Sequence, residues 1–171
     1  KEALSNLILV VSRVMAQSLT SGGTIFWCGN GGSAADSQHM AAELVGRFKK
    51  NRRPLRSIAL NADTSVLTCI ANDFSYEHIF SRQLEAHGRS GDILVGISTS
   101  GQSENILRAF KTAKDIGVTT VGLLGKGGGD ALAQVDHALV VPSDTTARIQ
   151  EAHILIGHMF CELIEVELGI S

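Results

Sequence analysis

The feature that most constrains this chain is an alternation of short apolar segments with segments of helical periodicity. In the helical segments, hydrophobic residues recur every three or four positions, as one face of a helix requires. Parallel strands need crossover connections that are usually helices, so the alternation is typical of a parallel sheet. We therefore predict one α/β domain over residues 1–171, a three-layer sandwich whose five-stranded parallel sheet has helices on both faces. The expected strands are 24–28, 57–60, 92–98, 118–124 and 137–141.

Composition is that of an ordinary globular domain and argues against several kinds of partner. The 171 residues are 44% hydrophobic and 19% charged, which is enough apolar side chain for a sizeable core. The formal charge of -2 argues against nucleic-acid binding, which needs a strong basic excess. No stretch approaches the ~20 apolar residues that cross a bilayer, so we expect no membrane partner.

The cysteines and one basic segment are local features of the composition. Cys28, Cys69 and Cys161 are odd in number and widely spaced, so we expect no disulfide framework and a reducing, cytoplasmic location. The basic segment lacks interleaved aromatic residues, and we expect a solvated loop, with a nearby anionic ligand as a further possibility. Its basic residues are Lys49, Lys50, Arg52, Arg53 and Arg56.

A small-residue turn follows the first expected strand. Residues 29–33 read Gly-Asn-Gly-Gly-Ser, and we expect a helix to begin at Ser33 with a capping-box-like start completed by Asp36. Glycines let backbone N–H groups approach an anion, and a helix N-terminus favours negative charge. The segment matches neither the dinucleotide fingerprint nor the Walker motif, so a large nucleotide is not indicated.

A second turn of this kind follows the third expected strand. Residues 98–103 read Ser-Thr-Ser-Gly-Gln-Ser and precede another helix, so their hydroxyls suit the oxygens of a terminal phosphate. Ligands bind at the carboxyl ends of parallel strands. We therefore expect the two turns to hold one sugar phosphate.

Polar residues on two expected helices are further candidates for chemistry. His39 and Glu43 stand four residues apart, so they lie on one helix face and could share a metal ion or a substrate, or form a surface pair. The last helix carries Gln150, His153 and His158 among apolar residues. A histidine there could be a ligand or an acid/base group, or a core residue with satisfied hydrogen bonds.

Five motifs occur together along the chain. They are Cys-Gly-Asn-Gly-Gly-Ser at 28–33, His-x-x-x-Glu at 39–43, Asn-Asp-Phe at 72–74, Gly-Ile-Ser-Thr-Ser-Gly-Gln-Ser at 96–103 and Arg-Ile-Gln-Glu-x-His at 148–153. Taken together and in this order, they closely resemble the bacterial sedoheptulose 7-phosphate isomerases, a family with a sugar isomerase (SIS) domain. The resemblance covers essentially the whole chain, and the joint occurrence is far more specific than any single motif.

The resemblance implies an activity, an assembly and a set of site residues. The activity is conversion of D-sedoheptulose 7-phosphate to D-glycero-D-manno-heptose 7-phosphate, the entry to heptose for lipopolysaccharide and other surface glycans. The assembly is a homotetramer with active sites near subunit contacts, and the cofactor is one Zn²⁺ per subunit. Glu43 matches the catalytic base and a substrate contact, and His158 matches the second acid/base group. The implied sugar contacts are Asn30, Gly31 and Gly32, and the phosphate contacts are Ser98, Thr99, Ser100 and Ser103. Asn72 and Asp73 line the site, Gln150 is a further substrate contact, and the implied zinc ligands are His39, Glu43, Gln150 and His158.

This chemistry also follows from the residue types. Interconverting a ketose and an aldose moves one proton between adjacent carbons through an enediol. A carboxylate such as Glu43 can remove that proton and return it. An imidazole suits proton transfer between the two oxygens near neutral pH, and Zn²⁺ would stabilise the enediolate charge. A zinc-bound histidine is a poorer proton shuttle, so the two roles of His158 compete. Gln150 and His158 are ~12 Å apart along a regular helix, so both reaching one ion requires extended side chains or a second subunit.

Three alternatives stay open at this point. Asn72 and Asp73 could simply end a helix rather than line a site. The chain could be a non-catalytic SIS protein that binds the replication initiator DnaA, or an isomerase for a different phosphosugar. His39, Glu43 and His158 favour the enzyme over the binding protein, because a purely binding relative has no reason to assemble that set.

Overall fold

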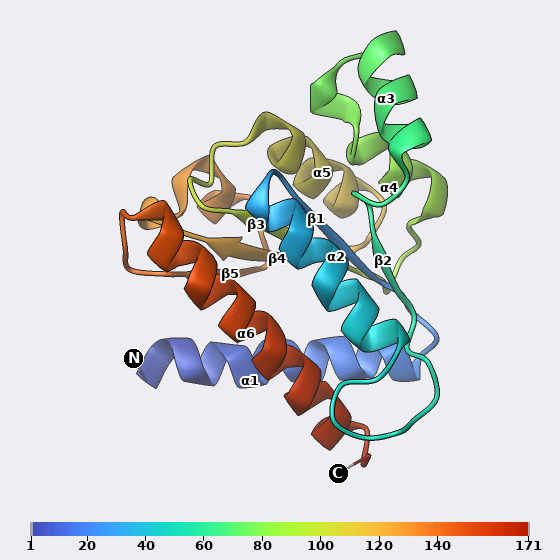
Figure 1. The fold of residues 1–171 in the computed structure, drawn as a ribbon, viewed down its shortest axis with the longest axis vertical. Helices are drawn as coiled ribbons and strands as arrows, with labels where there is room; N and C mark the ends of the chain where they lie inside the picture. The colour runs from blue at the N-terminus through green and yellow to red at the C-terminus, as the bar shows by residue number, and fades with distance from the viewer. Residues whose placement is uncertain (1, 171) are drawn as a thin grey trace.

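Five parallel strands form one sheet in the order β2-β1-β3-β4-β5 (Figure 1). The computed structural model describes the backbone of residues 2–170 and the side chains of residues 4–170, so both ends of the predicted domain, residues 1 and 171, lie outside the described residues. The elements are α1 (Glu2–Thr20), β1 (Ile25–Gly29), α2 (Gly32–Val45), β2 (Ser57–Ala59), α3 (Thr64–Asp73), η1 (Tyr76–His78), α4 (Ser81–His87), β3 (Ile93–Ser98), α5 (Glu104–Asp115), β4 (Thr119–Leu124), η2 (Lys126–Ala133), β5 (His137–Val140) and α6 (Thr146–Glu167).

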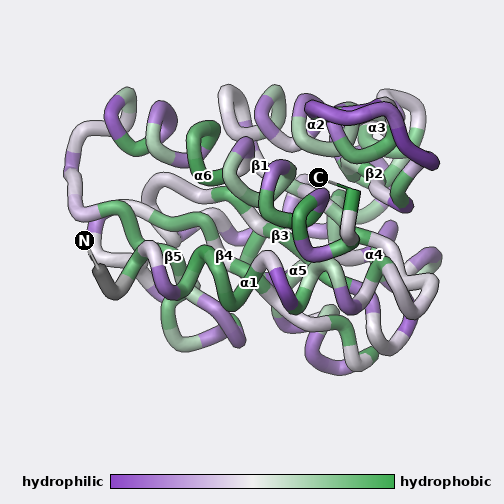
Figure 2. The backbone as a smooth tube through the Cα atoms, turned by 90° about the horizontal axis from the view of Figure 1, so that it is seen from below, coloured by the Kyte–Doolittle hydropathy of each residue, from purple (hydrophilic) through white to green (hydrophobic). Residues whose placement is uncertain are grey.

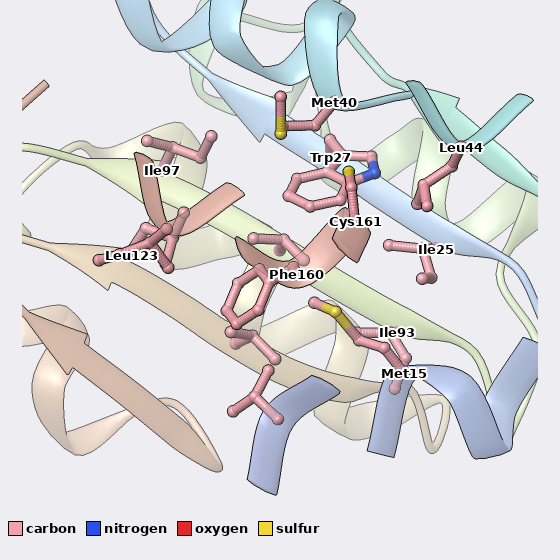
Figure 3. Close-up of a cluster of buried hydrophobic side chains, with 14 of the residues drawn as sticks. Met15, Ile25, Trp27, Met40, Leu44, Ile93, Ile97, Leu123, Phe160 and Cys161 are labelled. Carbon is pink, nitrogen blue, oxygen red and sulfur yellow. The ribbon is translucent and has the colours of Figure 1, made fainter. Parts of the chain in front are cut away.

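Helices cover both faces of this sheet, so the predicted three-layer sandwich is confirmed. Successive side chains of a strand point to opposite faces. In β1, Ile25 and Trp27 pack with α1, α2 and α6, whereas Phe26 and Cys28 pack with α3, α4 and α5. Apolar residues accordingly run through the middle of the molecule in Figure 2, and Figure 3 shows the first of the two layers around Trp27. The Trp27 indole N–H, fully buried, donates to Ser57 Oγ at 2.9 Å.

α2 and α6 lie side by side and parallel on one face of the sheet (Figure 1). Gly157 allows this approach, because a Cβ there would stand 2.4 Å from Sδ of the buried Met40. At the other end of the contact, a Cβ at Gly32 would stand 2.6 Å from Gln150 Nε2. These two contacts fix the register, so the first turn of α2 lies beside the first turn of α6.

Local predictions differ from the structure in two places. α2 begins at Gly32, and its N-cap is Gly31 with a φ of 57° and no side-chain capping bond, so the predicted capping box of Ser33 and Asp36 is wrong. The loop expected over 125–129 is confirmed at three consecutive glycines with non-helical backbone, but the helical turns around it are 3-10 and end at Ala133. The three cysteines are free thiols, as expected. Within residues 2–170, none of the helices combines the length and apolar character that spanning a membrane requires.

The basic segment after α2 folds back against α6. Arg52 Nε lies 2.9 Å from Glu165 Oε1, and the two side chains are 2% and 4% exposed. The prediction of a solvated loop is therefore wrong for Arg52, because its anionic partner is a carboxylate of the same chain. The prediction is confirmed for the exposed residues Lys49, Lys50, Arg53 and Arg56.

Glu165 should make the stability of the fold sensitive to acid. Burial raises the pKa of its carboxyl group, but hydrogen bonds from Lys49, Arg52, Phe48 and Lys50 outweigh burial and hold the pKa below the ordinary 4.5. A carboxyl group of lowered pKa stabilises the folded state above the unfolded pKa, and the stabilisation is lost as pH falls through the folded pKa. We expect Glu165→Gln to flatten the fall in the free energy of unfolding below about pH 5, measured by denaturant titration at each pH.

Glu167→Gln is the matched control, since Glu167 lies on the same helix in an exposed pair with Arg13. This variant should keep the pH dependence of the wild-type protein. A Glu165→Gln protein with that same pH dependence would show that its hydrogen-bonded carboxylate does not govern acid stability.

Candidate active site

The two small-residue turns lie next to each other at one edge of the sheet. The first follows β1 and the second follows β3, and these strands pair in parallel with Gly29 opposite Ile97. After β1 the chain forms β2 on one side of β1 and then β3 on the other side of β1, so the direction of the strand order reverses between the two turns. The crevice at such a switch point is where open α/β sheets bind ligands. The structure thus brings the two turns together, as the sequence predicts.

Asn30 connects the first turn to the start of α5 and to η1. Its side-chain amide exchanges two hydrogen bonds with the amide of the buried Asn105, each 2.9 Å long. Tyr76 Oη donates a third bond to Asn30 Oδ1 at 2.8 Å. Because Oδ1 then accepts two bonds, the group that this amide offers to a ligand is its second N–H. That donor suits a hydroxyl or phosphate oxygen.

The second turn is shaped by its own hydroxyls and by one glycine. Ser98 Oγ accepts the backbone N–H of Gly101 at 3.0 Å and lies 3.3 Å from Ser103 Oγ. Gly101 has a φ of 65°, and a Cβ there would stand 1.9 Å from the carbonyl oxygen of Gly128, so only glycine fits. Ser103 is the N-cap of α5 and makes no side-chain capping bond, which leaves the first N–H groups of α5 for an anion. Thr99 and Ser100, between these residues, are half-buried.

Asn72 and Asp73 form the last turn of α3, which confirms the helix-end interpretation. Both are exposed, and Asn72 Nδ2 donates to Asp73 Oδ1 at 2.8 Å. Tyr76, which follows shortly in η1, reaches Asn30. The segment therefore approaches the first turn through Tyr76, and a ligand-binding role for Asn72 and Asp73 stays a prediction.

A second group of polar side chains lies where α2 and α6 pack together. Ligand atoms of His39, Glu43 and His158 all lie within 4.8 Å of one another. His39 Nε2 is 3.1 Å from Glu43 Oε1, and the His39 and His158 rings meet edge to face with centroids 5.1 Å apart. Phe48 stacks on His158, with centroids 5.7 Å apart and planes at 19°. His39 and Glu43 are therefore more than a surface pair, because His158 joins them from another helix.

These three residues, called here the catalytic cluster after the role that we propose for them, could hold a metal ion. Two imidazoles and a carboxylate are ordinary zinc ligands, and three protein ligands leave a coordination position open, as catalytic sites do. Asp36 faces the same region: burial raises the pKa of its carboxyl group, and the nearby imidazoles of His39 and His158 partly offset that rise.

The structure does not bring Gln150 to the catalytic cluster. Its amide lies against Gly32 in the first turn of α2, whereas His158 lies ~12 Å further along α6. Gln150 as a zinc ligand stays a prediction that rests on family resemblance. His153 is buried, and its Nε2 donates to the Leu124 carbonyl at 3.1 Å. Burial lowers the pKa of His153, partly offset by this bond. His153 is thus a core residue as expected, but its hydrogen bonds are satisfied only at Nε2, because its buried Nδ1 has no partner among the described residues.

Sequence reasoning missed four residues that surround these groups. Asn105 and Tyr76 reach Asn30 from other segments, and Phe48 reaches His158 from the loop after α2, so no local spacing reveals them. Asp36 could have been found, because it precedes His39 by three residues and Glu43 by seven, which is helical spacing on one face.

The fold and the two turns define a class of protein, and sequence comparison agrees. The sequence model of the SIS domain matches residues 1–125, which include both turns and α2, so this is a SIS domain protein. Over 158 residues it is 56% identical to the phosphoheptose isomerase of Clostridium acetobutylicum, covering 92% of this chain and 81% of that relative. Over 164 residues it is 55% identical to the phosphoheptose isomerase of Campylobacter jejuni, covering 96% and 88%.

A solved structure agrees with these sequence relatives. The phosphoheptose isomerase GmhA from Neisseria gonorrhoeae matches with a TM-score of 0.91 and 44% identity, covering 96% of this chain and 88% of that one. The chain therefore belongs to the phosphoheptose isomerase family.

Asn105→Ala should release Asn30 from its fixed orientation. Removing one partner of a buried hydrogen-bonded pair typically costs about 1–3 kcal/mol in the free energy of unfolding. We also expect the affinity for sedoheptulose 7-phosphate to fall more than the affinity for inorganic phosphate, because Asn30 lies in the turn assigned to the sugar. Calorimetric titration of both ligands measures the two effects, and Tyr76→Phe should give a smaller change in the same direction. Equal losses for the two ligands would mean that Asn105 supports the fold without orienting Asn30.

Proposed function

We propose that this protein is an aldose–ketose isomerase that converts D-sedoheptulose 7-phosphate to D-glycero-D-manno-heptose 7-phosphate, the first step of nucleotide-activated heptose biosynthesis. The observation that carries the proposal is the catalytic cluster, whose three side chains converge within 4.8 Å in a chain related to phosphoheptose isomerases. The reaction needs a carboxylate and a second proton-transfer group beside one pair of carbons. The cluster supplies both.

In the proposed reaction Glu43 takes a proton from C1 of the ketose. The electron pair of that C–H bond forms the C1–C2 double bond of the enediol while the C2 oxygen gains a proton. Glu43 then returns its proton to C2, and the C1 hydroxyl loses its proton as the aldehyde forms. His158 transfers the proton between the two oxygens, and the 3.1 Å contact with His39 holds the Glu43 carboxylate in place.

The same donor set supports one Zn²⁺ per subunit, held by His39, Glu43 and His158. When bound, the ion would stabilise the negative charge that develops on the substrate oxygens. With one ring nitrogen on the ion the other would carry its hydrogen, so His158 would be a poor proton shuttle while the ion is bound, and its two proposed roles compete. The position of Gln150 against Gly32 supports a role at the sugar end of the site.

Substrate binding is proposed for the two turns and for the end of α3. The glycine-rich turn would meet the sugar, and the hydroxyl-rich turn with the N-terminus of α5 would bind the phosphate. The residues proposed for the sugar are Asn30, Gly31, Gly32, Asn72, Asp73 and Gln150, and those proposed for the phosphate are Ser98, Thr99, Ser100 and Ser103.

We further propose a cytoplasmic homotetramer of single SIS domains in which each active site uses two subunits. Gly32 and Glu43 are ~16 Å apart along α2, so the cluster and the turns of one chain lie far apart for a single substrate. The outer faces of α1 and α6 also suit subunit contact, because Leu9, Leu155 and Val166 are 40%, 60% and 51% exposed.

The isomerase activity is tested by incubating the protein with sedoheptulose 7-phosphate in deuterated water. We expect the aldose with deuterium at C2, because the proton on Glu43 exchanges with solvent. Glu43→Gln should lower kcat by about 10²–10⁴-fold, the usual contribution of general acid–base catalysis, while phosphate-sugar binding remains. Glu85→Gln, an exposed change on α4, should leave kcat unchanged. Absence of product with and without added zinc would reject the enzyme and favour the non-catalytic DnaA-binding function.

Shared active sites are tested by mixing two inactive variants under conditions that allow subunit exchange. One variant, Glu43→Gln, removes the proposed base from the catalytic cluster. The other variant combines Ser98→Ala with Ser103→Ala and removes proposed phosphate contacts from the second turn. If each site joins the turns of one subunit to the cluster of another, the mixture regains activity. Glu43→Gln mixed with His158→Gln is the control and should stay inactive, because every cluster then carries one defect. No recovery in the first mixture would show that each chain forms its own complete site.

A further inference from the structure

One buried ion pair joins the loop after α2 to α6, beside the catalytic cluster. Arg52 and Glu165 are in contact at 2.9 Å with side chains 2% and 4% exposed. Among the ion pairs of the described residues it is the one in which both side chains are buried; the Arg13–Glu167 pair, for comparison, is 65% and 34% exposed. A buried ion pair needs further hydrogen bonds to offset its loss of water. The other hydrogen bonds of Arg52 and Glu165 therefore show which parts of the chain the pair fixes in place.

On the arginine side, the pair holds the backbone of the proposed catalytic base. Arg52 Nη2 donates to the Glu43 carbonyl at 2.9 Å, and Nη1 donates to the Leu44 carbonyl at 2.8 Å. The last carbonyl groups of a helix have no hydrogen-bond partners within the helix, and here the Arg52 guanidinium donates to two of these carbonyls. The end of α2 that carries Glu43 is thereby tied to Arg52.

On the glutamate side, the pair holds the residue that packs on His158. The Glu165 carboxylate accepts the backbone N–H groups of Phe48, Lys49 and Lys50 at 3.3, 3.2 and 3.3 Å. The Phe48 ring in turn stacks on His158. Glu165 lies on α6 itself, seven residues or about two helical turns after His158. The carboxylate therefore fixes the loop that packs on the imidazole.

We propose that Arg52 and Glu165 are positioning residues that together set Glu43 against His158. The alternative is a pair that only stabilises the fold. The two roles can be separated, because apolar residues of similar size often replace a buried ion pair without loss of stability. Such residues cannot bind the Glu43 carbonyl or the Phe48 N–H. The catalytic consequence rests on the proposed isomerase function, whereas the structural consequence does not.

The experiment uses the full chain with Arg52→Met and Glu165→Met combined. We expect cooperative unfolding, a kcat lowered about 10- to 100-fold as for other residues that orient a reactive group, and a nearly unchanged KM. KM should hold because the turns lie at the far end of α2. The direct readout is the NMR resonance of the His158 ring protons, identified with His158→Gln. It should move toward its position in Phe48→Leu, because the stacked Phe48 ring shifts these protons.

Arg13→Met with Glu167→Met is the matched control, an ion pair that joins α1 to the same helix. It should leave the His158 resonance and kcat as in the wild-type protein. A folded Arg52→Met, Glu165→Met protein with the wild-type resonance would overturn the proposal, whatever its activity. If the wild-type protein turns over no heptose phosphate, the proposed function fails, and the resonance still decides the positioning role.

A second variant covers the case in which the double variant does not fold. Arg52→Lys keeps the charge opposite Glu165 but lacks the planar fork that reaches the Glu43 and Leu44 carbonyls. We expect it to fold, with the His158 resonance displaced in the same direction by a smaller amount. A wild-type resonance and wild-type kcat in Arg52→Lys would likewise overturn the proposal.

Discussion

The close parallel contact of α2 with α6 is the constraint on which the rest of the site depends. Gly157 permits this contact: a Cβ there would stand 2.4 Å from Sδ of the buried Met40, so a side chain at position 157 would have to displace that of Met40 within the core. A substitution that widened the contact between the two helices would separate His158 from His39 and Glu43. The geometry of the catalytic cluster is therefore set by a core contact between two helices that are far apart in sequence, rather than by a local motif.

The two turns depend on a different constraint, the strand order of the sheet. The reversal between β1 and β3 places them side by side, where their backbone N–H groups and hydroxyls suit an anion. The proposed binding and the proposed chemistry thus have separate structural origins in this chain. Changing side chains on the outer parts of α2 and α6 would leave both turns intact, which is why the turns alone indicate a ligand class and not a reaction.

What the sequence could predict follows the same division. The strands, the two turns and the sheet were predictable because each depends on residues that are near one another along the chain. The partners of Asn30, His158 and Arg52 were not, since each comes from a segment that only the fold brings close. Arg52 shows the reason most clearly: within a run of basic residues it has the pattern of a solvated side chain, and its burial follows only once α6 brings Glu165 alongside.

Cys161 bears on what kind of metal site the cluster could form. It lies about one turn after His158, and a thiolate there would give the cluster a fourth strong ligand of the kind that closes a structural zinc site. Burial, with smaller contributions from Glu43 and Glu165, raises the pKa of this thiol to about 12, and the side chain lies in the core layer with Trp27 (Figure 3). Because the Cys161 side chain packs in the core and is not among the ligand atoms that lie within 4.8 Å of one another, two imidazoles and one carboxylate form the donor set. For the metal site that we propose, such a set would keep a position open for a substrate oxygen, as catalytic zinc sites do.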